Sequence, residues 1–139
     1  MEKSDPLSLK QSIYLGDRAI KLIILDGWNE LAKIQVDSIS RVRSVDGKWN
    51  YYTAEDIEDG FLVFGNVRLF AIPPTGAIPN DYVTSFELNY GQPSNEVFRA
   101  HIITADLLPT GERGEIAIEV VGDVFYLEDP NRPGEKITS

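Results

Sequence analysis

Carboxylates are the first residues of this chain whose spacing could do chemistry. Four of them precede Gly60 in the run Glu55-Asp56-Ile57-Glu58-Asp59. Calcium prefers several oxygen ligands and favours carboxylates on a loop. The run does not fit an EF-hand loop, because Asn66 stands where a bidentate glutamate would be needed if Glu55 were the first ligand. We therefore expect a solvated acidic turn and no bound metal.

His101 is the single histidine and the natural candidate for a general base. Strand periodicity places it on the same face as Arg99 and opposite Phe98 and Ala100, so we expect it to point to solvent. The sequence contains no nucleophile elbow, phosphate-binding loop, dinucleotide-binding fingerprint or zinc-protease motif. We predict no catalytic residue and no cofactor, and we consider an enzyme less favoured than a binding protein.

Paired carboxylates keep one enzymatic alternative open. Glu115 with Glu119, and Glu128 with Asp129, are carboxylate pairs of the kind that glycosidases use, although such pairs are common on any acidic surface. Glu55 with Asp56 is a further pair that a concave site could collect. The alternative is a small-ligand-binding or hydrolytic domain with a carboxylate-lined pocket.

Aromatic residues suggest a binding surface. Trp28 lies in an expected hairpin loop, and Trp49 and Tyr51 share one face of a short strand. Core packing would explain Trp49 and one tyrosine, whereas exposed aromatics beside acidic residues would anchor an interface with a basic protein. The candidate binding residues are Trp28, Trp49, Tyr51, Glu55, Asp56, Glu58 and Asp59.

The overall charge narrows the class of partner. The 139 residues include 13 Lys plus Arg against 22 Asp plus Glu, which gives a formal net charge of −9. This charge repels phosphate backbones and anionic lipid, so we expect neither nucleic-acid nor membrane binding. There is no cysteine, and the polar residues 1–10 do not resemble a signal peptide. We expect a cytoplasmic protein with a basic protein partner, or a homo-oligomer formed through an open sheet edge.

Turn dipeptides indicate the elements that must position these residues. Gly65-Asn66 and Gly122-Asp123 are each flanked directly by apolar runs, the pattern of two-residue hairpins. Asp46-Gly47 predicts a third hairpin, and the loop 26–29 predicts a fourth between strands 19–25 and 30–39. Because Ala19–Leu25 is apolar on both sides, we expect this strand to be central and covered on both faces.

The predicted fold is one all-β domain over residues 1–139, an antiparallel, hairpin-rich sandwich or partly closed barrel of about 8 to 11 strands. Helical structure is limited to one or two short turns, at 7–12 and 53–57. Residues 72–81 contain three prolines and predict a crossing between sheets. Residues 1–10 and 130–139 are expected to be flexible ends.

Several short motifs resemble a family of small uncharacterised bacterial proteins, over roughly Ser12 to Leu88. They are Tyr14-Leu15-Gly16-Asp17-Arg18, Asp26-Gly27-Trp28-Asn29, Ile39-Ser40-Arg41-Val42-Arg43, Trp49-Asn50-Tyr51-Tyr52 and Pro79-Asn80-Asp81-Tyr82-Val83. The order of hairpins also resembles, more loosely, small all-β immunity proteins encoded beside bacterial polymorphic toxins. This second resemblance implies a protein that neutralises a toxin by binding it, and neither resemblance implies particular site residues.

Overall fold

Antiparallel strands dominate the chain in the computed structural model, which describes residues 5–45, 47–72, 79, 81–90, 97–108 and 110–139. A helix, α1 (Pro6–Gln11), precedes the strands, and a single 3₁₀ turn, η1 (Thr53–Glu55), interrupts them. The strands are β1 (Ile13–Tyr14), β2 (Ile20–Asp26), β3 (Leu31–Val36), β4 (Ser38–Val45), β5 (Lys48–Tyr51), β6 (Ile57–Glu58), β7 (Phe61–Gly65), β8 (Leu69–Ala71), β9 (Tyr82–Tyr90), β10 (Phe98–Leu107), β11 (Arg113–Gly122) and β12 (Val124–Glu128).

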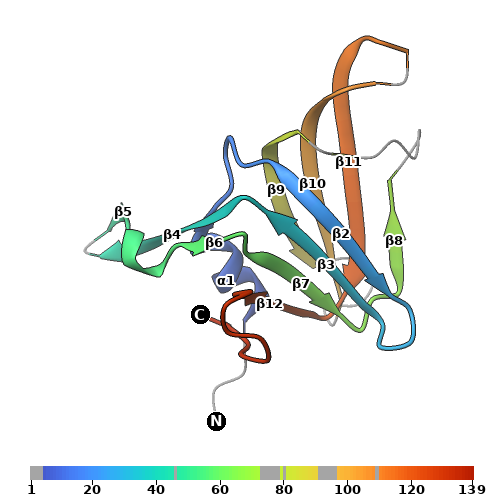
Figure 1. Cartoon of the computed structure of the whole chain (residues 1–139). Helices are drawn as coiled ribbons and strands as arrows, with labels where there is room; N and C mark the ends of the chain where they lie inside the picture. The colour runs from blue at the N-terminus through green and yellow to red at the C-terminus, as the bar shows by residue number, and fades with distance from the viewer. Residues whose placement is uncertain (1–4, 46, 73–78, 80, 91–96, 109) are drawn as a thin grey trace.

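These strands form three antiparallel sheets (Figure 1). The β2 sheet has the order β12-β7-β3-β2, and the β10 sheet has the order β8-β11-β10-β9. In the third, the arm sheet, β4 pairs with β1, β5 and β6. The described residues make an all-β, sandwich-like fold that does not close into a barrel, so the sandwich alternative of the prediction is confirmed.

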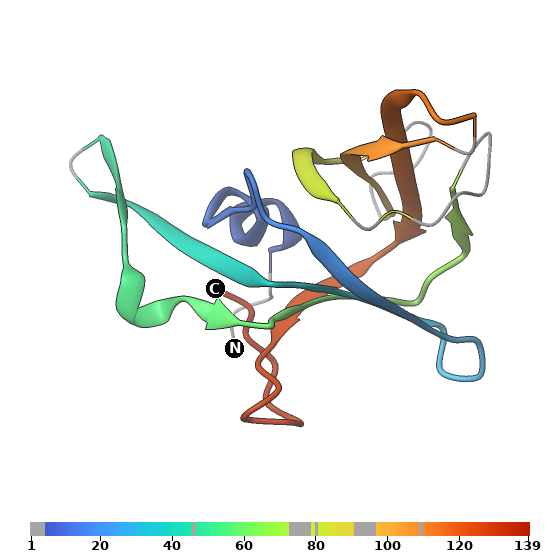
Figure 2. The same ribbon diagram turned by 45° about the horizontal axis from the view of Figure 1, so that its top comes forward.

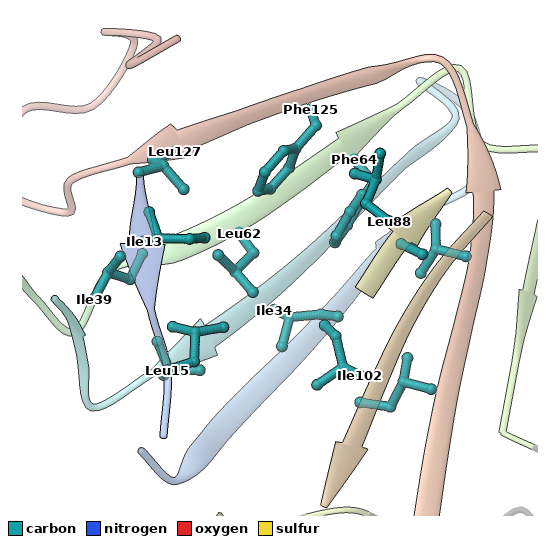
Figure 3. Close-up of a cluster of buried hydrophobic side chains, with 14 of the residues drawn as sticks. Ile13, Leu15, Ile34, Ile39, Leu62, Phe64, Leu88, Ile102, Phe125 and Leu127 are labelled. Carbon is teal, nitrogen blue, oxygen red and sulfur yellow. The ribbon is translucent and has the colours of Figure 1, made fainter. Parts of the chain in front are cut away.

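The core lies between the β2 sheet and the β10 sheet (Figure 3). Alternation places Ile118 and Val120 of β11 on the buried face. Phe64 of β7 stacks on Phe125 of β12 with ring centroids 5.1 Å apart and meets Phe98 of β10 edge-on at 6.1 Å. Aromatic packing therefore joins the two layers.

Two predicted hairpins are wrong. The strands on either side of Gly65-Asn66 do not pair, because β7 pairs with β3 and β12 while β8 pairs with β11. The strands around Gly122-Asp123 also part, since β11 stays in the β10 sheet and β12 joins the β2 sheet. Both dipeptides are crossings between the two main sheets.

The two crossings pack against each other. Asp123 donates its backbone N–H to the Gly65 carbonyl at 3.4 Å, and the Asn66 side-chain amide donates to the Asp123 carboxylate at 2.7 Å. Positive φ occurs at Asn66 (49°), not at either glycine. The glycines allow the two backbones to lie close together, because a β-carbon on Gly122 would lie 2.8 Å from the Gly65 carbonyl oxygen.

The other two hairpins are confirmed. β2 pairs with β3 across the turn that contains Trp28, and β4 pairs with β5 across Gly47, which has φ of 78°. Figures 1 and 2 show the β4–β5 hairpin extending away from the two main sheets, at the opposite end of the molecule from the β2–β3 turn. The described residues contain twelve strands, more than the 8 to 11 expected, because several have only two or three residues.

Both ends of the described chain make contacts with the strands. Pro6–Gln11 form α1, capped by the Asp5 side chain, with Leu9 buried against the core. Near the other end Ile137 pairs with Leu127 of β12. The proline-rich connection spans β8 and β9, which are opposite edges of one sheet, so it does not pass between sheets as expected; residues 73–78 and 80 of it lie outside the described part.

The contact between the crossings leads to a stability prediction. We expect Gly122→Ala to lower the free energy of unfolding by about 1 to 3 kcal/mol, because the added methyl group would collide with backbone. Gly27→Ala is the matched control, since nothing lies within 4 Å of its β-carbon position, and it should change stability by less than about 0.5 kcal/mol. Urea denaturation measures both, and equal effects would contradict this account of the crossing.

Candidate functional site

Strand β2 is an exposed sheet edge. It pairs with β3 on one side, and at its start Ile20 donates its N–H to the Asp81 carbonyl at 3.2 Å. Beyond that bond, no strand in the described part of the chain pairs with its other side. The outward N–H and C=O groups of such a strand can pair with another chain.

Apolar side chains occupy both faces of β2. The register places Leu22 and Ile24 on the outer face, while Ile23 and Leu25 face the sandwich interior. The exposed fractions are 46% for Leu22, 38% for Ile24 and 59% for Leu25. The prediction of a central strand covered on both faces is therefore wrong, because β2 is the last strand of its sheet.

A groove runs along this edge. It is about 380 Å³ in volume, lies between β2, β8 and Pro79, and is lined by Ile20, Lys21, Leu22, Ile23, Leu25, Phe70, Ile72 and Pro79. A second hollow of about 190 Å³ shares Leu25 and Phe70 with it and reaches Asp26, Gly27 and Glu30. The groove has the size of a ligand site and an apolar lining, with no carboxylate among the residues that line it.

Trp28 lies at the tip of the turn that ends β2 and is 93% exposed. The turn is held by Asn29, whose backbone N–H and side-chain amide donate to the Asp26 carboxylate at 3.1 and 2.8 Å. These bonds hold the pKa of Asp26 below its ordinary value, so Asp26 is negatively charged at neutral pH. We define the β2 edge surface as the groove together with Ile24 and Trp28.

Charge is distributed unevenly along the β2 edge surface. Lys21, near the start of β2, pairs with Asp59 at 2.6 Å. Asp26 and Glu30 lie at the other end, and the Glu30 carboxylate forms no ion pair with any residue that the structure describes. One end of the surface is therefore acidic and the other is neutralised.

The other predicted aromatics form a separate surface on the arm sheet. Trp49 and Tyr51 are more than half exposed, and Tyr51 meets Tyr14 of β1 edge-on with ring centroids 6.0 Å apart. The prediction that core packing explains Trp49 is wrong, because β5 lies on the projecting hairpin. Trp28 lies in the β2–β3 turn, and Figure 1 shows this turn at the opposite end of the molecule from the β4–β5 hairpin that carries both residues.

The four acidic residues of the predicted acidic turn mostly bind within the chain. Arg43 donates to the Glu55 carboxylate at 2.8 and 3.2 Å, and the Asp56 carboxylate accepts the backbone N–H of Arg41 at 2.9 Å. Glu58 is exposed on β6, and Asp59 holds Lys21. Within the described ranges, no group of three or more His, Asp and Glu side chains is arranged to hold a metal ion.

His101 lies on the outer face of the β10 sheet, as predicted. Its Nε2 atom is 3.7 Å from the Glu119 carboxylate, which also pairs with Arg99. Glu87 lies opposite His101 on the neighbouring strand β9. This row of polar side chains is typical of cross-strand pairing on a wet sheet face.

Buried polar groups were not anticipated from the sequence. The guanidinium of Arg41 is buried and donates to the backbone and side-chain oxygens of Ser12. Its pKa is lowered, mainly by burial and then by the nearby charge of Arg43. Thr104 donates a short hydrogen bond to the buried Asp106 carboxylate. These contacts satisfy polar groups inside the fold and do not open onto the groove.

The β2 edge surface was also missed, apart from Trp28. Its signal was present, since Ile20–Leu25 is apolar on both sides of a strand, but the pattern was interpreted as burial. Within the described residues, no helix has the length and apolar character needed to cross a bilayer.

Comparisons with known proteins were made with the whole chain. A family model described as a family of unknown function (DUF6258) matches residues 4–139, a longer stretch than the one over which the sequence motifs were recognised. No curated protein matches the chain. Among solved structures, an uncharacterized protein from Neisseria gonorrhoeae is similar at 14% sequence identity with a TM-score of 0.44, over 84% of this chain and 94% of that one.

The exposure of β2 can be tested by comparing two isoleucines. We expect Ile34→Ala to lower the free energy of unfolding by about 3 kcal/mol, because Ile34 is fully buried in β3. Ile24→Ala, on the exposed outer face of β2, should cost about 1 kcal/mol or less. Chemical denaturation compares the two, and similar losses would mean that β2 is covered on both faces.

The bond between Glu55 and Arg43 predicts a pH dependence. Arg43 donates to the Glu55 carboxylate and keeps its pKa below the ordinary value of 4.5. Because the folded-state pKa is lowered, the stabilisation is present above the unfolded-state pKa and is lost as the pH falls through the folded-state pKa. Carboxyl NMR titration should show a low midpoint for Glu55.

Arg43→Gln should return that midpoint towards the ordinary value. Lys48→Gln, which removes a positive charge from the same hairpin, is the control and should leave the midpoint nearly unchanged. A Glu55 midpoint unaffected by Arg43→Gln would show that the two side chains do not interact in solution.

Proposed function

The chain belongs to a family of unknown function (DUF6258), and from its own residues we propose that it is a protein-binding module. The observation that carries the proposal is strand β2, an edge strand with exposed apolar side chains on both faces. The β2 edge surface is the proposed binding site, and no catalytic step is proposed.

Edge strands with this composition are uncommon on proteins that act alone. Such edges are usually protected by charged residues, prolines or a covering segment, and large exposed apolar patches mark interaction sites. Lys21 is the one charged residue between Ile20 and Leu25, and it pairs with Asp59 at the start of the strand. In the part of the chain that the structure describes, the rest of β2 carries no such protection until Asp26.

Trp28 extends the same surface beyond the strand. Tryptophan is enriched among residues that contribute most to binding, because it buries a large area with few rotatable bonds. The Trp28 side chain is 93% exposed in the turn that follows β2, next to Gly27, which lines the second hollow, and an aromatic side chain placed there is suited to anchor a partner.

The partner we propose is a basic protein. The net charge of −9 attracts positively charged surfaces and speeds their association. A role as an immunity protein, which would neutralise a basic toxin domain by binding it, is one form of this proposal, and it is supported by the sequence resemblance alone.

The hydrolytic alternative receives no support from these contacts. Three pairs of carboxylates suggested it. Glu55 and Asp56 bind Arg43 and Arg41, and Glu115 and Glu119 lie on the outer face of the β10 sheet. Glu128, the neighbour of Asp129, pairs with Lys33. None of them lines the apolar groove.

Site-directed capture tests the proposed function. A photo-crosslinking amino acid at position 28 should capture one protein in the source organism, and the purified pair should bind in calorimetry. We expect Leu25→Lys to weaken this binding at least about tenfold, because it places a charge in the groove, as expected for a central interface residue.

Leu7→Lys is the matched control, since Leu7 is similarly exposed but lies on α1. It should bind with unchanged affinity. Capture that survives Leu25→Lys but is lost in Trp49→Ala with Tyr51→Ala would move the site to the arm sheet, and no captured partner would overturn the proposal.

A further inference from the structure

We propose that the partner binds as an added β-strand, antiparallel to β2 in the groove between β2 and β8, with basic residues beside Asp26 and Glu30. This inference rests on the proposed function and specifies the chemistry of the partner. It names an extended peptide segment as the occupant of the groove, not a small apolar ligand.

The backbone argument comes from the two walls of the groove. β2 ends the β2 sheet and β8 ends the β10 sheet, and Ile23 and Phe70 line the same cavity from these two strands. A strand at the end of a sheet presents unpaired N–H and C=O groups. An extended peptide can pair with those groups, whereas an apolar small molecule cannot.

The side-chain argument comes from the two faces of β2. A strand added beside β2 would place alternate side chains next to Leu22 and Ile24 on the outer face and next to Leu25 on the inner face. Inner side chains would also reach Phe70 and Ile72. The added segment should therefore carry apolar residues on both faces, as β2 does.

The charges place the basic residues of the added strand at the turn end of β2. Asp26 is ionised and Glu30 has no ion pair in the described part of the chain, so the turn end of β2 is negatively charged. At the other end Lys21 is neutralised by Asp59. An antiparallel strand starts at the turn end, so its basic residues should precede its apolar residues.

The same charges disfavour a second copy of this chain. Each copy carries a net charge of −9, so self-association brings two like-charged molecules together. Self-pairing through β2 would also leave Asp26 without a free basic residue, because Lys21 is already paired. We therefore infer a different, basic chain as the occupant.

Peptide binding tests the inference on the intact protein. The probes are fluorescein-labelled peptides with the sequence KKVTVIVTG, its acidic counterpart EEVTVIVTG, and KKVTPIPTG, in which prolines block strand pairing. Fluorescence anisotropy should show binding of the first peptide, binding about fivefold weaker or worse for the acidic one, and no binding of the third.

Two charge-reversal variants distinguish a local effect of Glu30 from a general effect of net charge on peptide binding. Glu30→Lys should remove the preference for the basic peptide, whereas Glu112→Lys, an exposed glutamate in the β10–β11 turn, should keep it. Leu25→Lys should abolish binding of both charged peptides. Hydrogen exchange measured by NMR should show protection of the β2 amides when the basic peptide is bound.

Other outcomes overturn the inference without deciding the proposed function. Peptide binding that leaves the β2 amides unprotected would show that the peptide docks through its side chains and not as an added strand. Equal affinity for the basic and the acidic peptide would overturn the inference that the added segment is basic. Absence of peptide binding, in a protein whose partner capture depends on Leu25, would overturn strand addition and leave the protein-binding function standing. A dimer in sedimentation experiments, with β2 amides protected and no peptide present, would identify a second copy as the occupant.

Discussion

The close approach of two backbones at Gly65 and Gly122 is the constraint on which the rest of this structure depends. At this point the chain leaves the β2 sheet after β7 and leaves the β10 sheet after β11. The Asn66–Asp123 hydrogen bond holds the two crossings together. The crossing after β11 brings β12 into the β2 sheet, where it pairs with β7 and forms one edge. The opposite edge of that sheet is β2. The crossing after β7 brings β8 to the edge of the β10 sheet, where it pairs with β11. The groove between β2 and β8 is therefore a consequence of the two crossings.

The strand content could be predicted from the sequence, but the partners of the strands could not. The Asp46-Gly47 turn depends on neighbouring residues, and the hairpin predicted there is confirmed. The two glycine dipeptides failed because glycine permits two different things, positive φ in a hairpin and contact between two backbones. The choice between them depends on segments about sixty residues away, such as β12 opposite β7. A bulge opposite Ile103 and Thr104 also shifts the alternation of β9, which a strict period of two does not show.

The candidate site was predicted from the sequence only in part, because the exposure of β2 depends on its position at the edge of the sheet. Residue type alone singled out Trp28, and the structure leaves it 93% exposed in the turn after β2, next to Gly27 of the second hollow. An apolar run on β2 has the same pattern whether a sheet or solvent lies beyond it, so its exposure required the strand order. The acidic residues suggested a charged surface, but Glu55 and Asp59 are engaged by Arg43 and Lys21, which lie far from them in sequence.

The pairing of β7 with β12 also has a kinetic consequence. Phe61 of β7 lies opposite Glu128, so this pairing closes a loop of nearly half the chain, and contacts of such long range form slowly. Chains emerge from the ribosome at roughly 5–20 residues per second, N-terminal end first. For several seconds of synthesis β3 and β7 are available while β12 does not yet exist, and β7 is then a second apolar edge. A nascent chain in that state exposes two unpaired apolar edge strands, β2 and β7. It is most vulnerable to aggregation before β12 has been synthesised.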